Sequence, residues 1–212
     1  MAPEVTAVET VEFEFERADV GPDDGFNLVY DPDETTVSRA SVLRVHTDAG
    51  VVGETLGRAD QRIAEYLLGE NPLRRERHWS ELKRAYRQGS GSALGPVDVA
   101  LWDVAGKIAG LPIHHLLGSY RDRLPCYAST PHGDENGGLD CPEAYADFAE
   151  SCLDRGYPAF KIHGWGGSDD ARDVEREIET VRAVAERVGD EMDLMLDPAC
   201  EFETFTDALK VG

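Results

Sequence analysis

The sequence predicts a two-part fold, with an antiparallel sheet and helices in the first half and a parallel α/β sheet in the second. Three observations lead to this prediction. Apolar and acidic residues alternate from residue 4 to about 16, which is the pattern of a half-buried strand. A 3-4-3-4 apolar spacing over 94–109 is typical of a helix with one buried face. After residue 124, short apolar runs alternate with amphipathic segments, as in parallel strands joined by helices.

Turn-forming residues separate the elements of the first half. A Gly-, Pro- and Asp-rich stretch over 20–34 predicts a loop after the first strand. Gly50 allows the positive φ that a tight turn needs and predicts a hairpin. Asn71 and Pro72 form a good N-cap and first-turn pair, which predicts the start of a helix. We therefore expect strands at 38–47 and 51–55 and helices at 63–68, 72–88 and 94–109.

Glycines also bound the elements of the second half. Gly156 and Gly189 follow two amphipathic segments and predict their C-terminal ends. The strand-like runs in this half are each five residues long, as expected of buried strands. We therefore expect strands at 124–128, 159–163 and 193–197, helices at 142–155 and 173–188, and the start of another helix near residue 204.

The charge balance excludes several kinds of partner. The chain has 42 acidic and 21 basic residues, for a net charge of −21, and four of its basic residues are lysines. Nucleic acid and anionic membranes are poor partners for such a surface. A dense carboxylate shell with few lysines is typical of proteins from salt-accumulating halophiles. No apolar run approaches eighteen residues and no basic segment precedes an apolar one at the N-terminus, so we expect a cytoplasmic location.

Three residues with chemical potential lie at the ends of two predicted strands. Lys161 and His163 close the run at 159–163, and Asp197 closes the run at 193–197. The C-terminal ends of parallel strands lie on the same side of a sheet, so these side chains are expected to converge. A lysine, a histidine and a carboxylate together form a candidate site for proton transfer and metal binding. The alternative is that Lys161 and His163 only line the sheet.

Five short sequence motifs follow one another along the chain. They are VHTDAGVVGE at 45–54, PVDVALWDVAGK at 96–107, GLPIHHLLG at 110–118, AFKI at 159–162 and DLMLD at 193–197. In this order they resemble the enolase superfamily, in its mandelate racemase and muconate lactonizing branch. The resemblance implies a capping domain over residues 1–120. It also implies, over residues 121–212, the first three strands of an incomplete (β/α)8 barrel.

The resemblance also implies a chemistry. Members of this family use a divalent ion, usually Mg²⁺, to bind a substrate carboxylate and to stabilise the enediolate formed when the α-proton leaves. By position, Asp197 matches the first metal ligand of the family. Lys161 and His163 match the two lysines of a Lys-x-Lys motif, in which the second residue is the base and the first tunes it. His163 departs from this pattern, but neutral imidazole can also act as a base near pH 7.

Substrate contacts are expected from two further segments. The 20–34 stretch matches the capping-domain loop that closes over substrate in the family, which makes Phe26, Asn27 and Tyr30 candidates for setting specificity. An acidic surface loop is the alternative. Ser129 and Thr130 follow the first barrel strand, where substrate oxygens are often bound, although loop polarity explains them equally well.

The expected function is that of the N-terminal portion of a Mg²⁺-dependent acid-sugar dehydratase or racemase, which abstracts the α-proton of a small carboxylate substrate. The alternative is a catalytically inactive truncated fragment, or one half of a split enzyme. Either a homo-oligomer or a complementing C-terminal fragment is then the expected protein partner. A phosphoacceptor receiver domain is disfavoured, because its lysine should follow the aspartate, whereas Lys161 precedes Asp197.

Overall fold

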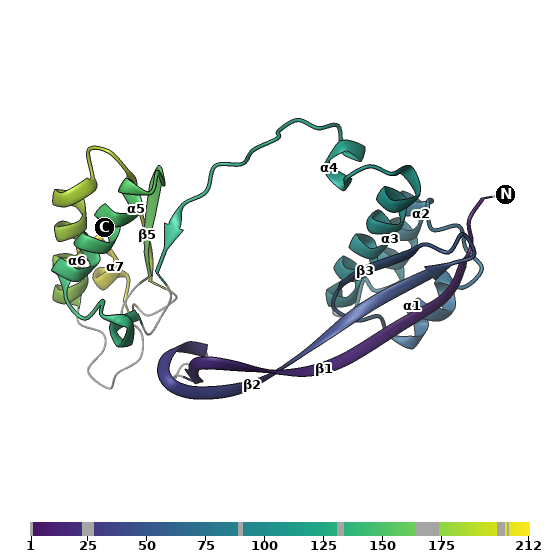
Figure 1. Ribbon diagram of the computed structural model, residues 1–212, viewed down its shortest axis with the longest axis horizontal. Helices are drawn as coiled ribbons and strands as arrows, with labels where there is room; N and C mark the ends of the chain where they lie inside the picture. The colour runs from purple at the N-terminus through teal and green to yellow at the C-terminus, as the bar shows by residue number, and fades with distance from the viewer. Residues whose placement is uncertain are drawn as a thin grey trace. The chain divides into compact units, whose positions relative to one another are not determined.

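The structure is a computed structural model that describes residues 2–22, 28–88, 91–130, 134–163, 174–198, 202 and 204–212. The chain divides into two compact units (Figure 1). The first unit comprises Met1–Phe15 and Ser38–Asp122, and the second comprises Glu16–Val37 and Arg123–Gly212. Among the described residues, no helix combines the length and the apolarity that a membrane span requires.

The antiparallel sheet has the strand order β1-β2-β3, with β1 (Val5–Pro22), β2 (Leu28–Thr47) and β3 (Val52–Leu56). The predicted hairpin is confirmed: β2 and β3 pair from Val42↔Leu56 to His46↔Val52, and Gly50 has a φ of +71°. The prediction of a loop over 20–34 is wrong at both ends, because β1 continues to Pro22 and β2 begins at Leu28, while residues 23–27 lie outside the described residues. Polar side chains support the extension, since the Thr36 hydroxyl donates to the Val20 carbonyl at 2.7 Å.

The helices of the first unit follow the hairpin. The helix predicted over 94–109 is confirmed, and Gly110 ends it with a φ of +64°. The helix predicted from Pro72 begins later, because the Asn71 side chain accepts a hydrogen bond from the Leu73 N–H at 2.9 Å and thereby closes a turn. The helices are α1 (Gln61–Leu67), α2 (Arg75–Ala85), α3 (Leu94–Ala109) and α4 (Ile113–Leu116), with a 3₁₀ turn η1 (Gly91–Ala93) before α3.

The core of the first unit lies between β2, β3, α1 and α3. Val97, Leu101 and Val104 form the buried stripe of α3 and belong to one apolar cluster with Leu43 and Val45 of β2. All five side chains are at most 1% exposed. The apolar spacing of α3 therefore serves to cover the sheet, as the sequence predicts.

The second unit contains a parallel sheet with the strand order β4-β5-β6. The strands predicted at 159–163 and 193–197 are confirmed as β5 (Ala159–His163) and β6 (Asp193–Asp197). The strand predicted at 124–128 is wrong in its extent, because β4 is only Ala128–Ser129. Leu124 is 75% exposed and makes no part of the sheet. The helices are α5 (Pro142–Asp154), α6 (Val174–Val188) and α7 (Phe205–Val211), with a 3₁₀ turn η2 (Asp134–Gly137).

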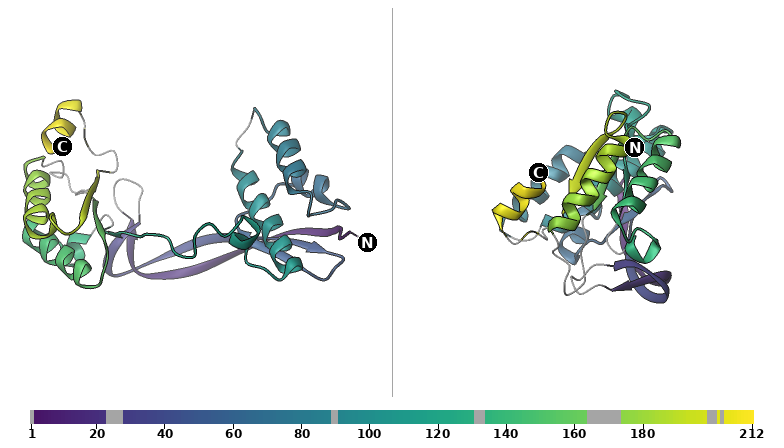
Figure 2. Two further views of the ribbon diagram at one scale, coloured as in Figure 1. Left: turned by 90° about the horizontal axis from the view of Figure 1, so that it is seen from above. Right: turned by 90° about the vertical axis from the view of Figure 1, so that its left-hand side faces the viewer.

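One face of the parallel sheet is covered by helices α5 and α6 (Figures 1 and 2). Phe160 and Ile162 of β5 are at most 1% exposed and pack with Tyr145 of α5 and Val184 of α6. Side chains alternate along a strand, so the residues between and after them lie on the opposite face. This alternation leaves Lys161 and His163 on the face that the helices do not cover.

Candidate active site

The register of the parallel sheet brings the ends of β5 and β6 level with each other. His163 pairs with Asp197, and Lys161 pairs with Met195 two residues earlier. Both strands are short apolar runs that stop at a polar residue, so the polar residues gather at one edge. The edge is formed by C-terminal strand ends, which is where parallel α/β folds bind ligands.

Three side chains converge at this edge. The Lys161 Nζ donates a hydrogen bond to Asp197 Oδ2 at 2.8 Å. His163 Nε2 lies 3.6 Å from the same oxygen. The side chains of Lys161 and His163 are each 21% exposed and that of Asp197 is 42% exposed, so the group is partly shielded but open to solvent on the carboxylate side. An ammonium, an imidazole and a carboxylate can together bind an anion or a cation and move a proton.

The hydrogen bond that Lys161 donates to Asp197 raises the pKa of Lys161 above its ordinary value. Partial burial lowers this pKa, and the negative charge of Asp197 raises it further. The Tyr127 ring also faces the ammonium, with 5.6 Å between Nζ and the ring centroid. Lys161 is therefore an ammonium in this arrangement, held between a carboxylate and an aromatic ring.

The donor set at this edge suits part of a Mg²⁺ site. Mg²⁺ takes six oxygen ligands in a near-ideal octahedron, and carboxylates are its usual protein ligands. Asp197 supplies one carboxylate. Within the described ranges no group of three or more His, Cys, Asp or Glu side chains is placed to hold a metal ion. Asp197 thus fits as one ligand, and the described residues do not supply the rest of a coordination shell.

Ser129 and Thr130 reach the same edge from β4 but differ in exposure. Ser129 is exposed, and its hydroxyl donates to the Thr130 carbonyl at 3.2 Å. Thr130 is 2% exposed. Its N–H donates to the Lys161 carbonyl at 3.2 Å, and its Oγ1 accepts the His163 N–H at 2.9 Å. Ser129 is accessible to a ligand, whereas the Thr130 hydroxyl is turned toward the β5 main chain.

The capping-loop candidates are only partly described. Phe26 and Asn27 lie outside the described residues. Tyr30 lies in β2 and is 40% exposed. Its carbonyl accepts a hydrogen bond from Asn136 Nδ2 at 2.9 Å, and a Cβ added to Gly137 would lie 3.4 Å from the Tyr30 ring. Tyr30 therefore contacts η2, which follows β4, rather than the Lys161 side chain.

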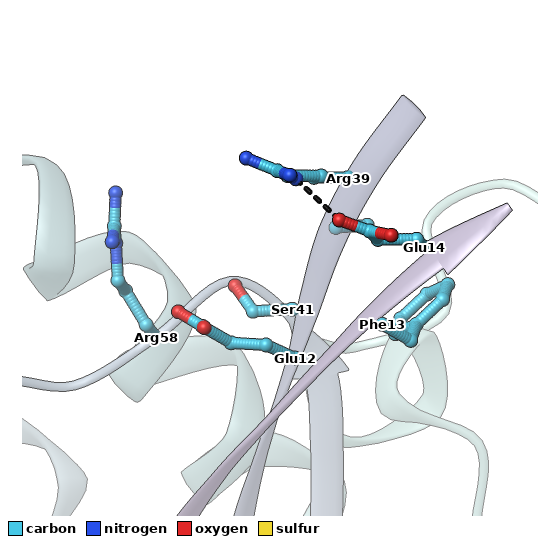
Figure 3. A pocket seen from close by; sticks show the side chains of 7 residues that line it. Glu12, Phe13, Glu14, Arg39, Ser41 and Arg58 are labelled. Carbon is cyan, nitrogen blue, oxygen red and sulfur yellow. Dashed lines mark hydrogen bonds and ion pairs between the residues drawn. The ribbon is translucent and has the colours of Figure 1, made fainter. Parts of the chain in front are cut away.

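A hollow of about 710 Å³ opens on the sheet of the first unit, and it contains none of the predicted site residues (Figure 3). Its charged groups balance, and Arg39 Nε donates to Glu14 at 2.6 Å. Among the described residues this wide hollow holds no group of side chains placed to bind a metal ion, and its charges are partly paired, so the strand ends are the better candidate site. The lining residues are Glu12, Phe13, Glu14, Arg39, Ala40, Ser41 and Arg58.

Tyr127 was not anticipated as a site residue. It precedes Ser129 by two positions, and side chains two apart on an extended segment share a face. That spacing is the only signal in the sequence that could have indicated its place near Lys161.

Two family models match the chain. The N-terminal domain of mandelate racemase and muconate lactonizing enzyme matches residues 33–118, and the enolase C-terminal domain-like family matches residues 144–212. The matches follow one another in the order of the two units.

Solved structures resemble the chain over nearly its whole length. D-glucarate dehydratase from Agrobacterium tumefaciens, complexed with magnesium, is 32% identical with a TM-score of 0.83, and the alignment covers 98% of this chain and 57% of that one. A member of the enolase superfamily from Polaromonas sp. JS666 is 27% identical with a TM-score of 0.72, covering 98% and 55%. Dipeptide epimerase from Enterococcus faecalis V583, at 20% identity and a TM-score of 0.72, covers 98% and 57% and shows the shared fold. The chain thus spans little more than half the length of these proteins.

Proposed function

Because the chain belongs to the enolase superfamily, in its mandelate racemase and muconate lactonizing branch, we propose that it is the N-terminal portion of a metal-dependent enzyme that removes the α-proton of a carboxylate. The chain carries an α+β capping domain followed by an incomplete (β/α)8 barrel, with three parallel strands among the described residues. We assign residues 1–120 to the capping domain and 121–212 to the barrel.

The observation that carries the proposal is the convergence of Lys161, His163 and Asp197 at the C-terminal ends of β5 and β6. An α-proton next to a carboxylate is very weakly acidic, so its removal requires a base and a positive charge that stabilises the dianion. His163 is the proposed base, and Lys161 is the proposed second proton-transfer and charge-stabilising group. Both groups are within 4 Å of Asp197, which keeps acid, base and metal ligand in one place.

Mg²⁺ is the proposed cofactor, with Asp197 as one of its ligands. When bound, a divalent ion stabilises the negative charge that develops on the substrate carboxylate. The magnesium in the D-glucarate dehydratase structure supports this choice. The remaining ligands have to come from residues other than those described here, since the strand ends provide a single carboxylate.

The proposed substrate is a hydroxylated carboxylate of the acid-sugar type, and the proposed reaction is dehydration in preference to racemisation. The 32% identity with D-glucarate dehydratase supports dehydration. In the proposed site, Ser129 contacts the substrate from β4, and Phe26, Asn27 and Tyr30 set specificity from the capping side. A cytoplasmic location is part of the same proposal.

A second candidate function follows from the single carboxylate at the site. In this case the 212-residue chain has no activity alone and acts only with a fragment that supplies the remaining strands. The two candidates differ in one measurable property, because the second predicts activity only after complementation.

The test is α-proton exchange in D₂O, followed by ¹H NMR on D-glucarate with Mg²⁺ present. The chain is assayed alone and after co-expression with the part of the Agrobacterium dehydratase that lies outside the aligned region. We expect no exchange by the chain alone, and exchange by the complex that falls at least about 100-fold in Lys161→Ala and His163→Ala. Lys210→Ala is the matched control, since Lys210 lies on α7 and pairs with Asp207 at 3.7 Å. Exchange by a complex that carries both site substitutions would refute the assigned roles.

A further inference from the structure

We infer that Thr130 is a positioning residue that fixes the end of β5, and with it His163, and that it does not bind substrate. The catalytic consequence of this inference rests on the function proposed above. The structural part of the inference is that the last hydrogen bond between β4 and β5 depends on the Thr130 hydroxyl. This part does not rest on the proposed function.

The ladder between β4 and β5 is short. Among the described residues the register pairs are Ala128↔Phe160 and Ser129↔Lys161. The next rung begins normally, because the Thr130 N–H donates to the Lys161 carbonyl at 3.2 Å. In a regular parallel ladder the His163 N–H would then donate to the Thr130 carbonyl. Here it donates to the Thr130 side chain instead, at 2.9 Å.

The Thr130 side chain takes the place of the Thr130 carbonyl as the acceptor of the His163 N–H. The Thr130 carbonyl accepts the Ser129 hydroxyl at 3.2 Å and takes no part in the rung to His163. β4 ends at Ser129, so the main chain no longer follows β5 at this level. The hydroxyl of Thr130 extends the ladder by one hydrogen bond beyond the end of β4.

His163 depends on this hydrogen bond more than Lys161 does. His163 is the last residue of β5, and on its other side it pairs with Asp197 of β6. Lys161 is held by main-chain pairs on both sides, with Ser129 and with Met195. Loss of the Thr130 hydroxyl should therefore release the main chain at His163 and leave that at Lys161 in place.

The Thr130 hydroxyl is not available for direct contact with a substrate. Thr130 is 2% exposed, and its Oγ1 already accepts a main-chain N–H. A ligand at the open edge meets Ser129, which is exposed, before it could reach Thr130. Removing the hydroxyl leaves a poorly solvated N–H without its partner, which is the costly way to lose a hydrogen bond.

The structural experiment measures amide hydrogen exchange of His163 by NMR in the chain itself. In Thr130→Val we expect the His163 amide to exchange at least about tenfold faster relative to the Phe160 amide, because an opening free energy of about 1.4 kcal/mol corresponds to a factor of ten. Thr130→Ser retains the hydroxyl and should keep the wild-type ratio. If the valine variant does not fold, Thr130→Ala gives the same readout.

Thr180→Val is the matched control for a buried threonine in the same unit. Thr180 is 0% exposed, and its hydroxyl donates to the Arg176 carbonyl one turn earlier in α6 at 2.9 Å. Its replacement should lower overall stability without changing the His163 to Phe160 ratio. Equal ratios in the Thr130 and Thr180 variants would overturn the inference.

The catalytic experiment uses the complemented enzyme. A positioning role predicts that Thr130→Val lowers kcat about 10- to 100-fold, leaves KM within about twofold, and is rescued by Thr130→Ser, because misplacement of a catalytic group by about 1 Å can cost about 100-fold. A substrate-binding role predicts a raised KM with kcat retained, and that result would overturn the inference. Absence of exchange in the wild-type complex would refute the proposed function, and the amide ratios would still decide the structural part.

Discussion

Replacing Gly53 by alanine tests how closely β3 packs on α3. Gly53 is buried in β3 and pairs with Val45 of β2. A side chain at this position would point toward α3. A Cβ at this position would lie 2.6 Å from Val104 Cγ2 and would also meet the Ala100 carbonyl oxygen. Val104 and Ala100 are 0% exposed, so neither can yield without a shift of the helix.

The expected loss of stability follows from this geometry. Overpacking a well-packed core costs about 1–3 kcal/mol. One of the obstructing atoms is a main-chain oxygen that no rotamer change can move, so we expect about 3 kcal/mol. For a unit of about 100 residues, this corresponds to a fall in Tm of roughly 12–24 °C. Thermal and urea denaturation, followed by circular dichroism in molar KCl, measures both quantities.

Gly95→Ala is the control, because it makes the same chemical change in the same unit. Gly95 lies in α3, and a Cβ there would meet no atom within 4 Å. Alanine in a helix should raise stability by up to about 1 kcal/mol. If Gly53→Ala costs less than about 0.5 kcal/mol, or no more than Gly95→Ala, the close approach of β3 and α3 is not what the structure implies.

Three further predictions concern charge and metal binding. Asp60 caps α1 by accepting the Ile63 N–H at 2.9 Å and also accepts the Tyr86 hydroxyl at 2.6 Å, so Asp60→Ala should cost about 1–2 kcal/mol at pH 7. Burial raises the pKa of Asp60, but these hydrogen bonds lower it by more, so that it lies below its ordinary value. The stabilisation by Asp60 is therefore full above about pH 4 and is lost as the pH falls through the folded-state pKa of Asp60. A difference in unfolding free energy between wild type and Asp60→Ala that stays constant down to about pH 2.5 would contradict this. The net charge of −21 should oppose folding at low ionic strength, so Tm should rise from tens of millimolar to molar KCl, and equal values would remove the halophile interpretation. The chain alone should bind Mg²⁺ no better than about millimolar, because one carboxylate is a small part of its shell; a micromolar Kd by calorimetry would refute this.

Elements whose signals are local could be predicted from the sequence. The helix over 94–109 and the strands at 159–163 and 193–197 occur at the predicted residues. The helix has an apolar period of its own and a glycine at its end. The strands are short apolar runs between turn-forming residues, so neither required knowledge of a distant partner.

Elements that depend on partners distant in the sequence were predicted less accurately. Leu124 to Tyr127 reads as a strand, but among the described residues the register with β5 begins at Ala128. Conversely, the Gly-, Pro- and Asp-rich stretch after Val20 reads as a loop, yet β1 extends into it as far as Pro22 and β2 already begins at Leu28, where the two strands support each other. Composition alone could not distinguish a loop from a long hairpin arm.

The candidate site also has some features that could be predicted from the sequence and others that could not. The approach of Lys161 and His163 to Asp197 could be predicted, because strand ends in a parallel sheet lie together. The placement of Thr130 could not be predicted, because it depends on the residue at which β4 ends. The contact of Tyr127 with Lys161 likewise depends on that short strand.

Paramagnetic broadening by Mn²⁺ tests most directly whether Asp197 binds a divalent metal beside Lys161 and His163. Substoichiometric Mn²⁺ is added to the ¹⁵N-labelled chain in molar KCl, which screens the acidic surface. We expect the signals of Lys161, His163 and Asp197 to broaden first, and Asp197→Asn to abolish this preference. Asp193→Asn removes the same charge from the opposite end of β6 and should leave it intact. Broadening that is spread over the acidic surface, or that is the same in both variants, would contradict the proposed metal site.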